Sequence, residues 1–423
     1  MKTIKLAPGE RLVTNQLNRK GVLPQNIVDA ARDIVANVRA NGDAAVRDYC
    51  QRFDGVELQS FRLPQEQIDA ALEGLDPAFV AALEKAARQI REFHQREVEQ
   101  SWFTTRADGT MLGVKVTPLA AAGIYVPGGR AQYPSTVLMN AIPAKVAGVK
   151  ELIMVTPPTE NLNDAVLAAA KIAGVDRVIA VGGAQAVAAL AYGAGFIPKV
   201  DKLVGPGNAY VAAAKRMAYG TLDIDMVAGP SEVLVIADES ADPKYVAADL
   251  LSQAEHDRLA SSVLLTTSQG LATRVDAEII RQTSYLGRSE IIAASLRDFG
   301  CAIVCRDLKQ AAELANEVAP EHLEIVTEDP RSLLPDIQNA GAVFLGAWSP
   351  EPLGDYLAGP DHVLPTSGTA RFFSPLSVDS FLKTMSVVEF SRETLAPIRE
   401  EIVTMAEAEH LTAHANSIRV RFE

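Results

Sequence analysis

Residues 177–185 read Arg177-Val178-Ile179-Ala180-Val181-Gly182-Gly183-Ala184-Gln185. The apolar run predicts a buried strand, and the two glycines predict a tight turn. A helix is expected to begin at about Gln185. A strand that passes through a glycine turn into a helix is half of a β-α-β unit, and such units build parallel sheets.

The same alternation extends in both directions along the chain. Residues 152–155 predict a strand before a helix at 163–173, and residues 202–204 predict a strand before a helix at 209–219. This rhythm predicts a parallel sheet with helices on both faces. A second series follows, so we expect an α/β fold with two Rossmann-like parallel-sheet domains that lack the G-x-G-x-x-G fingerprint. The strands of the second series are expected near 233–237, 263–267, 302–305, 323–326 and 342–345.

The chain has 423 residues, enough for several domains. Its N-terminal region reads as helical: Asn26 can cap a helix that stops at Gly42, and Asp76-Pro77 can start a long helix that carries His94 as a surface or packing residue. The expected domains are an N-terminal arm (1–21), a main α/β domain (22–124 and 231–376), a Rossmann-like domain (125–230) and a helical C-terminal tail (377–423).

Composition and charge argue against several classes of protein. The formal net charge is −13, so a phosphate backbone would be repelled and nucleic acid is not an expected partner. Three cysteines, Cys50, Cys301 and Cys305, cannot pair completely and are expected to be structural thiols. Residues 178–198 carry no charge, but their glycines favour a strand, a turn and a short helix over a membrane span. The N-terminus shows no long apolar run, which favours the cytoplasm.

Glycine-rich loops follow three of the predicted strands, where parallel sheets commonly bind ligands. They occupy residues 125–129, 182–185 and 205–208. The last two open helices, whose free N–H groups favour an anion such as a pyrophosphate. Tyr125, in the first loop, offers an aromatic face for a planar ring. The glycines could equally serve only to make tight turns.

Most of the six histidines stand beside acids or amides at the predicted ends of elements. Each one alone is more often structural than functional. Several such sets together indicate either a metal site or an acid–base site. The sets are Gln253 with His256, Glu321 with His322, Asp355 with His362, and Glu409 with His410 and His414.

Longer strings of residues resemble the marker segments of the histidinol dehydrogenase family, in the family's order and from about residue 20 to the end of the chain. They are Gly205-Pro206-Gly207-Asn208-Ala209, Ala228-Gly229-Pro230-Ser231-Glu232-Val233, Ser252-Gln253-Ala254-Glu255-His256, Ala319-Pro320-Glu321-His322-Leu323, Gly354-Asp355-Tyr356 through His362-Val363-Leu364-Pro365-Thr366, and Leu411-Thr412-Ala413-His414.

The resemblance implies one zinc ion per subunit, held by Gln253, His256, Asp355 and His414. Imidazole nitrogens and carboxylate or amide oxygens suit Zn²⁺. In this family the zinc mainly grips the amine and the imidazole of the substrate, and so orients it.

The resemblance also implies that Glu321 and His322 are the catalytic acid–base pair of a four-electron oxidation. The substrate would be L-histidinol, oxidised through L-histidinaldehyde to L-histidine, the last steps of histidine biosynthesis. His322 would take the alcohol proton while a hydride leaves for NAD. Glu321 would activate a water that attacks the aldehyde, and a second NAD would take the second hydride.

Further roles are implied by the same resemblance. Tyr125, Gln185 and Asn208 would contact NAD. The enzyme would be a homodimer in which Glu409 and His414 reach the partner's active site. The residues implied to hold the substrate are Ser231, Gln253, His256, His322, Asp355, His362, Glu409 and His414.

Two positions depart from the family's pattern. Asp361 stands where Asn is usual, which puts the role of the neighbouring His362 in question, and Arg258 stands where Pro often follows His256-Asp257.

Four other readings stay open. Relatives with the same zinc and NAD machinery oxidise other small polar alcohols, although the presence of both Glu409 and His414 favours histidinol. A zinc hydrolase could use Glu321 to activate water but would not reduce NAD. A non-catalytic nucleotide-binding protein would not need Glu321 and His322. An aldehyde dehydrogenase would need a cysteine nucleophile, and no cysteine here stands where its pKa would be lowered.

Overall fold

The computed structural model describes residues 1–5, 23–56, 60–128, 133–158, 162–227 and 229–423. Most of the expected N-terminal arm, together with Gly129 and Ala228, lies outside these residues. The chain divides into two compact units: Met1–Glu97 with Leu119–Phe381, and Val98–Pro118 with Leu382–Glu423. Each unit is described by itself. Within the described residues, every helix is too short or too polar to cross a membrane.

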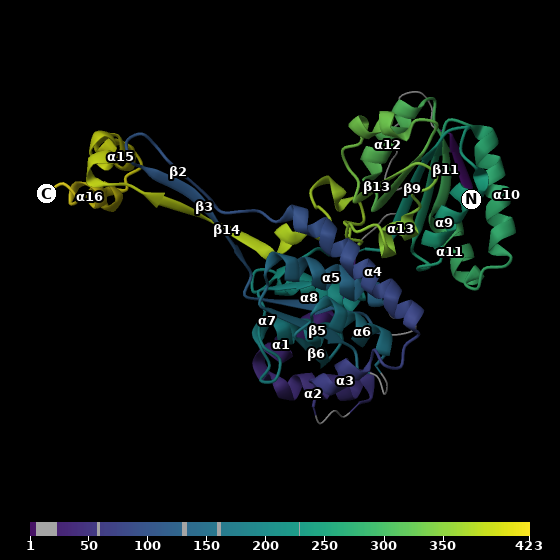
Figure 1. Cartoon of the computed structure of the whole chain (residues 1–423), viewed down its shortest axis with the longest axis horizontal. Helices are drawn as coiled ribbons and strands as arrows, with labels where there is room; N and C mark the ends of the chain where they lie inside the picture. Colours follow the sequence, from purple (N-terminus) through teal and green to yellow (C-terminus); the bar gives the residue numbers. More distant parts are fainter. Residues whose placement is uncertain (6–22, 57–59, 129–132, 159–161, 228) are drawn as a thin grey trace. The chain divides into compact units, whose positions relative to one another are not determined.

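One parallel sheet of the first unit has the strand order β6-β5-β4-β7-β8 (Figure 1). Helices α5 and α6 pack together on one face with α3 and α4, and helices α7 and α8 pack together on the other face with α1 and α2. The strands are β4 (Ala121–Tyr125), β5 (Glu151–Thr156), β6 (Arg177–Ala180), β7 (Lys202–Val204) and β8 (Asp223–Ile224); the helices that connect them are α5 (Pro134–Ala147), α6 (Asp164–Ala173), α7 (Gly183–Tyr192) and α8 (Ala209–Ala218).

The other parallel sheet has the order β1-β11-β10-β9-β12-β13. When β1 is set aside, each sheet has five strands in the same spatial order. The strand that comes first in the chain (β4 or β9) is central, the next two lie on one side of it, and the last two lie on the other side. This shared order confirms the two Rossmann-like domains. The strands are β1 (Lys2–Lys5), β9 (Glu232–Ala237), β10 (Ser261–Thr266), β11 (Gly300–Val304), β12 (His322–Val326) and β13 (Ala342–Leu345), and the helices are α9 (Pro243–Ala254), α10 (Gln269–Thr283), α11 (Ser289–Phe299), α12 (Leu308–Val318) and α13 (Glu351–Tyr356).

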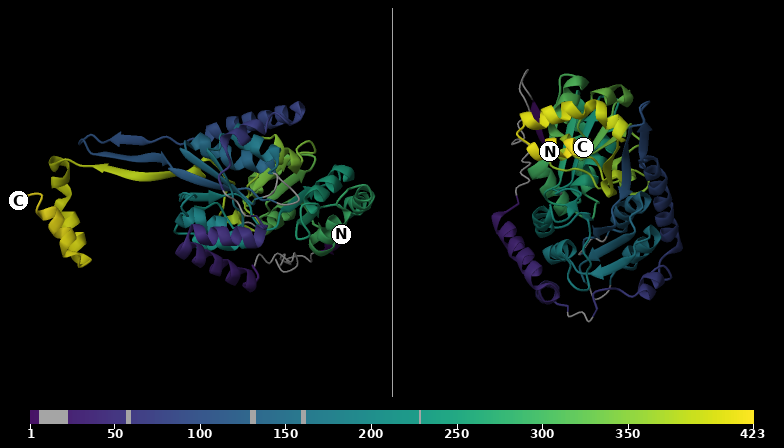
Figure 2. Two further views of the ribbon diagram at one scale, coloured as in Figure 1. Left: turned by 90° about the horizontal axis from the view of Figure 1, so that it is seen from below. Right: turned by 90° about the vertical axis from the view of Figure 1, so that its left-hand side faces the viewer.

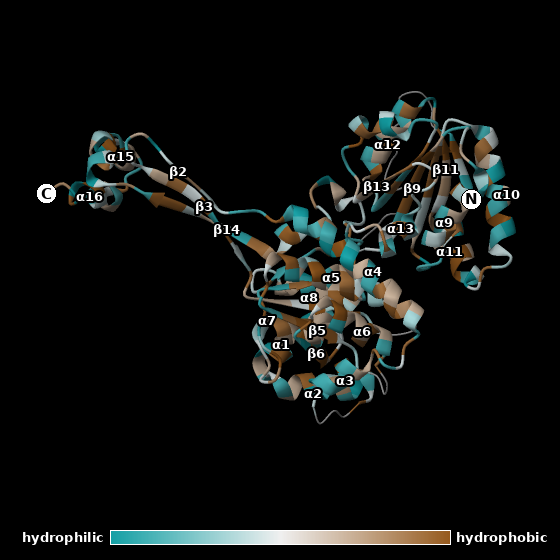
Figure 3. Ribbon diagram, viewed as in Figure 1, coloured by the Kyte–Doolittle hydropathy of each residue, from teal (hydrophilic) through white to brown (hydrophobic). Residues whose placement is uncertain are grey.

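Burial explains why the central strands read as continuous apolar runs. Every residue of β9 and of β10 is buried, because helices cover both faces of the sheet. Fully burying one Val, Leu or Ile side chain contributes roughly 1.5–3 kcal/mol. In Figure 3 these strands are largely brown, whereas α10 and α12 carry hydrophilic segments.

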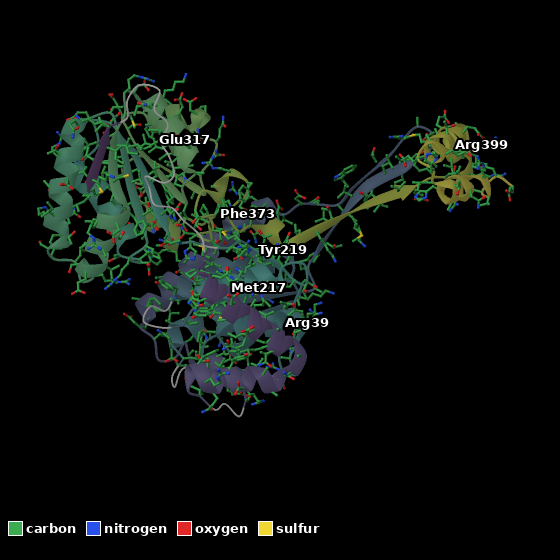
Figure 4. The ribbon with its side chains drawn as sticks, turned by 180° about the vertical axis from the view of Figure 1, so that it is seen from behind. Arg39, Met217, Tyr219, Glu317, Phe373 and Arg399 are labelled. Carbon is green, nitrogen blue, oxygen red and sulfur yellow. The ribbon has the colours of Figure 1, made fainter. Side chains whose placement is uncertain are left out.

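The N-terminal helices pack on the five-stranded sheet, so the expected grouping of residues 22–124 with the main domain was wrong. Residues of α1 and α2 share a hydrophobic core with β5, β6, α7 and α8. Arg39 of α1, labelled in Figure 4, lies over the Tyr192 ring of α7 at 5.3 Å. The bounds are α1 (Gln25–Asn41), α2 (Asp43–Asp54), α3 (Gln65–Ala70) and α4 (Pro77–His94).

Two of the helix caps were tested by the structure. The Asp76 side chain accepts a hydrogen bond from the Ala78 N–H, with Pro77 at the first helical position, as predicted. Helix α1 ends at Gly42, with φ 54°, but it begins after Pro24 rather than at the expected cap Asn26. Pro24 holds an extended backbone with φ −56° and ψ 137°, which places the helix start two residues earlier.

The second unit contains an antiparallel sheet of order β14-β3-β2 and two packed helices, α15 and α16 (Figure 2). The tail is therefore helical only after its first strand, and residues 98–118 belong with it rather than with the main domain. Strand β14 is mostly exposed and so lacks the alternation that marks a half-buried strand. The elements are β2 (Trp102–Thr105), β3 (Met111–Pro118), β14 (Leu382–Glu389), α14 (Arg392–Leu395), α15 (Arg399–Ala408) and α16 (Thr412–Arg419).

Candidate active site

A cavity of about 470 Å³ in the first unit gathers most of the predicted site residues. Pro127, Pro206 and Gly207 reach it from the carboxyl ends of β4 and β7, whereas Ser231 and His322 reach it from the amino ends of β9 and β12. The cavity is therefore lined from the carboxyl ends of strands in one sheet and from the amino ends of strands in the other. The predicted residues that line this cavity are Ser231, Gln253, His256, Glu321, His322, Asp355 and His362.

Glu321 and His322 are held by the backbone of one residue, Glu232, at the start of β9. His322 donates from Nδ1 to the Glu232 carbonyl over 3.0 Å, and Glu321 Oε2 accepts from the Glu232 N–H over 2.8 Å. With Nδ1 committed as a donor, Nε2 of the neutral imidazole is the nitrogen that can accept a proton. Burial lowers the pKa of His322 to about 4 and raises the pKa of Glu321 well above its usual value.

Gln253 and His256 come from the end of α9, where the His256 N–H donates to the Gln253 carbonyl over 3.2 Å. Gln253 is only 1% exposed, and its Oε1 has no hydrogen-bond partner among the described residues. Leaving a buried acceptor unpaired costs about 1–3 kcal/mol, so this oxygen is suited to bind a cation.

Two carboxylates on α13 complete a possible metal site. One ligand atom from each of His256, Glu351 and Asp355 lies within 4.8 Å of the other two. Sequence reasoning missed Glu351, although it stands four residues before Asp355 and so on the same helix face. Burial and the nearby Asp355 charge raise the pKa of Glu351 to about 8, a crowding of negative charge that a cation would relieve.

His362 contacts Asp355, with 3.3 Å between Nδ1 and Oδ1. Burial alone would raise the pKa of Asp355, but the hydrogen bond from His362 and the nearby imidazoles of His322 and His256 outweigh it, and the pKa is lowered. His362 can therefore hold the Asp355 carboxylate in place.

Glu409 and His414 belong to the second unit, where both are exposed. Glu409 ends α15 and His414 lies in the first turn of α16.

Two of the predicted NAD residues, Tyr125 and Asn208, lie at the carboxyl ends of β4 and β7, where the strand order of the five-stranded sheet reverses, whereas Gln185 follows the edge strand β6. Dinucleotides bind at such points in Rossmann folds. Asn208 caps α8 by accepting from the Tyr210 and Val211 N–H groups. The Tyr125 hydroxyl accepts from the Gly183 N–H over 3.0 Å. Gln185, at the start of α7, is 2% exposed, and its Oε1 is unpaired among the described residues.

Tyr125 does not offer an open aromatic face, because only 2% of it is exposed. Burial raises the pKa of its hydroxyl to about 12. One glycine of the neighbouring loop is required: Gly205 has φ 102°, and a Cβ there would lie 2.3 Å from the Tyr125 carbonyl oxygen. The two loops thus approach each other through their backbones.

The two departures noted in the sequence lie away from the cavity wall. Asp361 is buried, accepts from the Val363 N–H over 2.7 Å and lines a different cavity. Arg258 is exposed. The cysteines are buried too, and burial raises the pKa of Cys50 to about 12 and of Cys305 to about 11, which disfavours a thiolate nucleophile at either.

Comparisons with known proteins agree with the family resemblance seen in the sequence. A family model described as histidinol dehydrogenase matches residues 17–422. The histidinol dehydrogenase of Clostridium acetobutylicum is 52% identical over 417 residues, 98% of this chain and 97% of the relative. That of Caldanaerobacter subterraneus is 57% identical over 408 residues, 96% and 95% of the two chains. A crystal structure of histidinol dehydrogenase from Elizabethkingia anophelis superposes with a TM-score of 0.91 at 36% identity, covering 100% of this chain and 98% of the other.

Proposed function

This chain belongs to the histidinol dehydrogenase family of oxidoreductases, and we propose that it oxidises L-histidinol to L-histidine through L-histidinaldehyde, with two NAD used in turn. The observation that carries the proposal is the buried pair Glu321 and His322, oriented by Glu232, in one cavity with Gln253, His256 and Asp355.

His322 acts first, as the base for the substrate hydroxyl. Its Nδ1 is committed to the Glu232 carbonyl, so Nε2 takes the hydroxyl proton as the C–H bond breaks. When bound, NAD would supply the hydride acceptor for each of the two steps. A buried, neutral imidazole suits this role because it begins each cycle without a proton on Nε2.

Glu321 acts in the second oxidation. Its carboxylate removes a proton from a water that adds to the aldehyde, and the resulting hydrate gives up the second hydride. The hydrogen bond from the Glu232 N–H stabilises the carboxylate form against burial.

Gln253, His256 and Asp355 would hold a zinc ion, together with His414 of a second copy. The unpaired Oε1 of Gln253 and the close approach of His256 to Asp355 support this donor set. When bound, zinc would orient the amine and imidazole of the substrate as a Lewis acid. Ser231, His362 and Glu409 would add polar contacts to the substrate.

NAD would bind at the reversal of strand order, near Tyr125, Gln185 and Asn208. The free N–H groups at the starts of α7 and α8 suit its pyrophosphate.

The active assembly would be a homodimer in which the second unit of each chain supplies Glu409 and His414 to its partner. The second unit is small, with a core of Val403, Ala406 and Ala415. It exposes large apolar side chains, among them Trp102, Phe103 and Met405. Apolar surface of this kind favours packing against another chain.

The decisive experiment measures NADH formation from NAD and L-histidinol by the purified protein, before and after chelation and after zinc is restored. Two NADH per histidinol, lost on chelation and regained with zinc, are expected. Zinc-dependent NAD reduction with other polar alcohols only would change the substrate. Failure to reduce NAD with any alcohol would favour the zinc-hydrolase reading, in which Glu321 activates water for hydrolysis.

A further inference from the structure

A second cavity, of about 380 Å³, lies beside the active site and contains a cluster of titratable residues with no part in the chemistry above. His94, from the end of α4, lines it together with Glu97 and Asp361. His322 and His362 line both this cavity and the active-site cavity. The two cavities therefore share the proposed base in their walls.

The cluster is arranged as a row. Glu97 Oε2 accepts from His94 Nδ1 over 2.6 Å and from the Val378 N–H over 3.1 Å. On the other side of the ring, His94 Nε2 lies 3.9 Å from Asp361 Oδ2. Glu97 is the outer end of the row, with 27% of its side chain exposed, whereas the side chains of His94 and Asp361 are 1% exposed.

The facing atoms of His94 and Asp361 are unusual for a purely structural contact. Nε2 and Oδ2 are both buried, and neither has a hydrogen-bond partner among the described residues. A packing histidine would be expected to satisfy both ring nitrogens, since an unpaired buried polar atom is costly. His94 and Asp361 both line the cavity of about 380 Å³, whose wall is mostly apolar but which has room for water, since one molecule needs only about 10–15 Å³.

The charged groups around the cluster leave it able to hold an extra proton. Glu97 and Asp225 are the acidic groups near Asp361. The Val363 N–H donates a hydrogen bond to the other carboxyl oxygen of Asp361, Oδ1. Asp225 is itself paired with Lys215. Burial raises the pKa of Asp361 well above its usual value, so this carboxyl can carry a proton where an exposed one would not.

The proposed oxidation has to export protons from a buried site. One alcohol and one water become a carboxylate while two NAD become two NADH, and three protons are released. The imidazolium formed at His322 is disfavoured by burial, so its proton must leave before the next step. Histidine, which exchanges protons near neutral pH, suits such a path.

We propose that Asp361, His94 and Glu97 form a proton-release relay from the cavity beside His322 to the surface. The Nε2 proton of His322 passes through water to the Asp361 carboxylate and then to His94 Nε2. His94 gives its Nδ1 proton to Glu97 Oε2, and Glu97 gives it to solvent. Transfer of the Nε2 proton to Nδ1 through water in the cavity then restores the starting tautomer. This inference rests on the proposed function.

The test separates hydride transfer from proton release. In Asp361→Asn and in His94→Gln, the first hydride transfer should form one NADH per site at the wild-type rate, because His322 can still accept one proton. Steady-state turnover should fall about tenfold or more, and its solvent deuterium isotope effect should increase. The small base 1,2-dimethylimidazole, whose methyl groups hinder metal binding, should restore much of the steady-state rate.

A control and a second variant keep the result interpretable. Ser374→Ala, at the same cavity but outside the row, should change neither the first hydride transfer nor the steady-state turnover. Glu97→Gln, at the exposed end of the row, should show the same defect as the two buried variants, and it keeps the test valid if those variants fold poorly. Equal loss of both phases without rescue, or unchanged steady-state turnover in all three relay variants, would overturn the relay. Absence of NAD reduction in the wild type would instead overturn the proposed function.

Discussion

His322 donates a hydrogen bond from Nδ1 to the backbone carbonyl of Glu232 over 3.0 Å. The N–H of the same residue binds Glu321 over 2.8 Å. One peptide position at the start of β9 therefore sets the direction of both members of the proposed acid–base pair. A strand backbone is more rigid than a side-chain partner, so the imidazole keeps the tautomer that leaves Nε2 able to accept a proton.

Replacing the base should remove catalysis without removing binding. In His322→Asn, NADH formation from histidinol should fall about a hundredfold or more, because proton transfer is lost. NAD and zinc should still bind, as measured by fluorescence titration and metal analysis. His410→Asn is a matched control, since His410 is exposed with φ 59°, a conformation that Asn tolerates. Full activity in His322→Asn would contradict the assignment.

Glu321→Gln should separate the two oxidations. Glutamine can still accept from the Glu232 N–H, so the local structure should persist. It cannot take a proton from water, so NADH formation from L-histidinaldehyde should fall more than the first hydride transfer from histidinol. Rapid-mixing measurements with each substrate check this. An aldehyde rate equal to that of the wild type would count against Glu321.

The unpaired oxygen of Gln253 predicts a metal-dependent stability. A ligand present at about one hundred times its Kd adds about 2.7 kcal/mol to the free energy of unfolding. Zinc should therefore raise the Tm of the chelated wild type by several degrees, and Gln253→Ala should lose most of this rise. Gln269→Ala, on the start of α10, should keep it. A Tm that zinc leaves unchanged in the wild type would argue against the site.

Asp249 and Glu324 predict a pH dependence of stability. Burial raises the pKa of Asp249 from 3.8 to about 6 and the pKa of Glu324 well above its usual value. Because the folded pKa of Asp249 lies above the unfolded one, its protonation stabilises the native state below about pH 4, and this contribution is lost as the pH rises through about 6.

The variant Asp249→Asn should remove that dependence. Between pH 4 and pH 7 the free energy of unfolding should fall more in the wild type than in the variant, by up to roughly 3 kcal/mol. Urea unfolding at several pH values measures the difference, with the exposed Asp336→Asn as the control. Parallel pH profiles for wild type and Asp249→Asn would refute the prediction.

The buried ion pair of Lys215 and Asp225 should stabilise the loop after β7. Lys215 Nζ also donates to the Gly205 carbonyl over 3.0 Å, and Asp225 accepts from the Gly205 N–H over 2.8 Å. Lys215→Met leaves a buried carboxylate unpaired and should cost about 3–5 kcal/mol. The double variant Lys215→Met with Asp225→Leu should recover much of this loss in urea unfolding. A single variant as stable as the wild type would show that the pair contributes little.

Sequence patterns were informative wherever the signal was local. The cap at Asp76, the glycine stop at Gly42 and the apolar strands of both sheets were predicted from neighbouring residues and confirmed. The exposed strand β14 was missed because its pairing with β3 leaves no alternation to detect. Glu351 was missed because the six-residue helix α13 gives too short a periodic signal.

The sequence by itself determined the strand–helix alternation, the absence of a G-x-G-x-x-G fingerprint and, through resemblance, the family. These properties reside in residues adjacent in the chain, where propensity and periodicity act. Only the tertiary structure decided that β12 presents Glu321 and His322 from its amino end toward Gln253 and His256, and that α4 brings His94 to Asp361. Such contacts depend on how separate elements pack and which side chains they bury, and no local pattern encodes that.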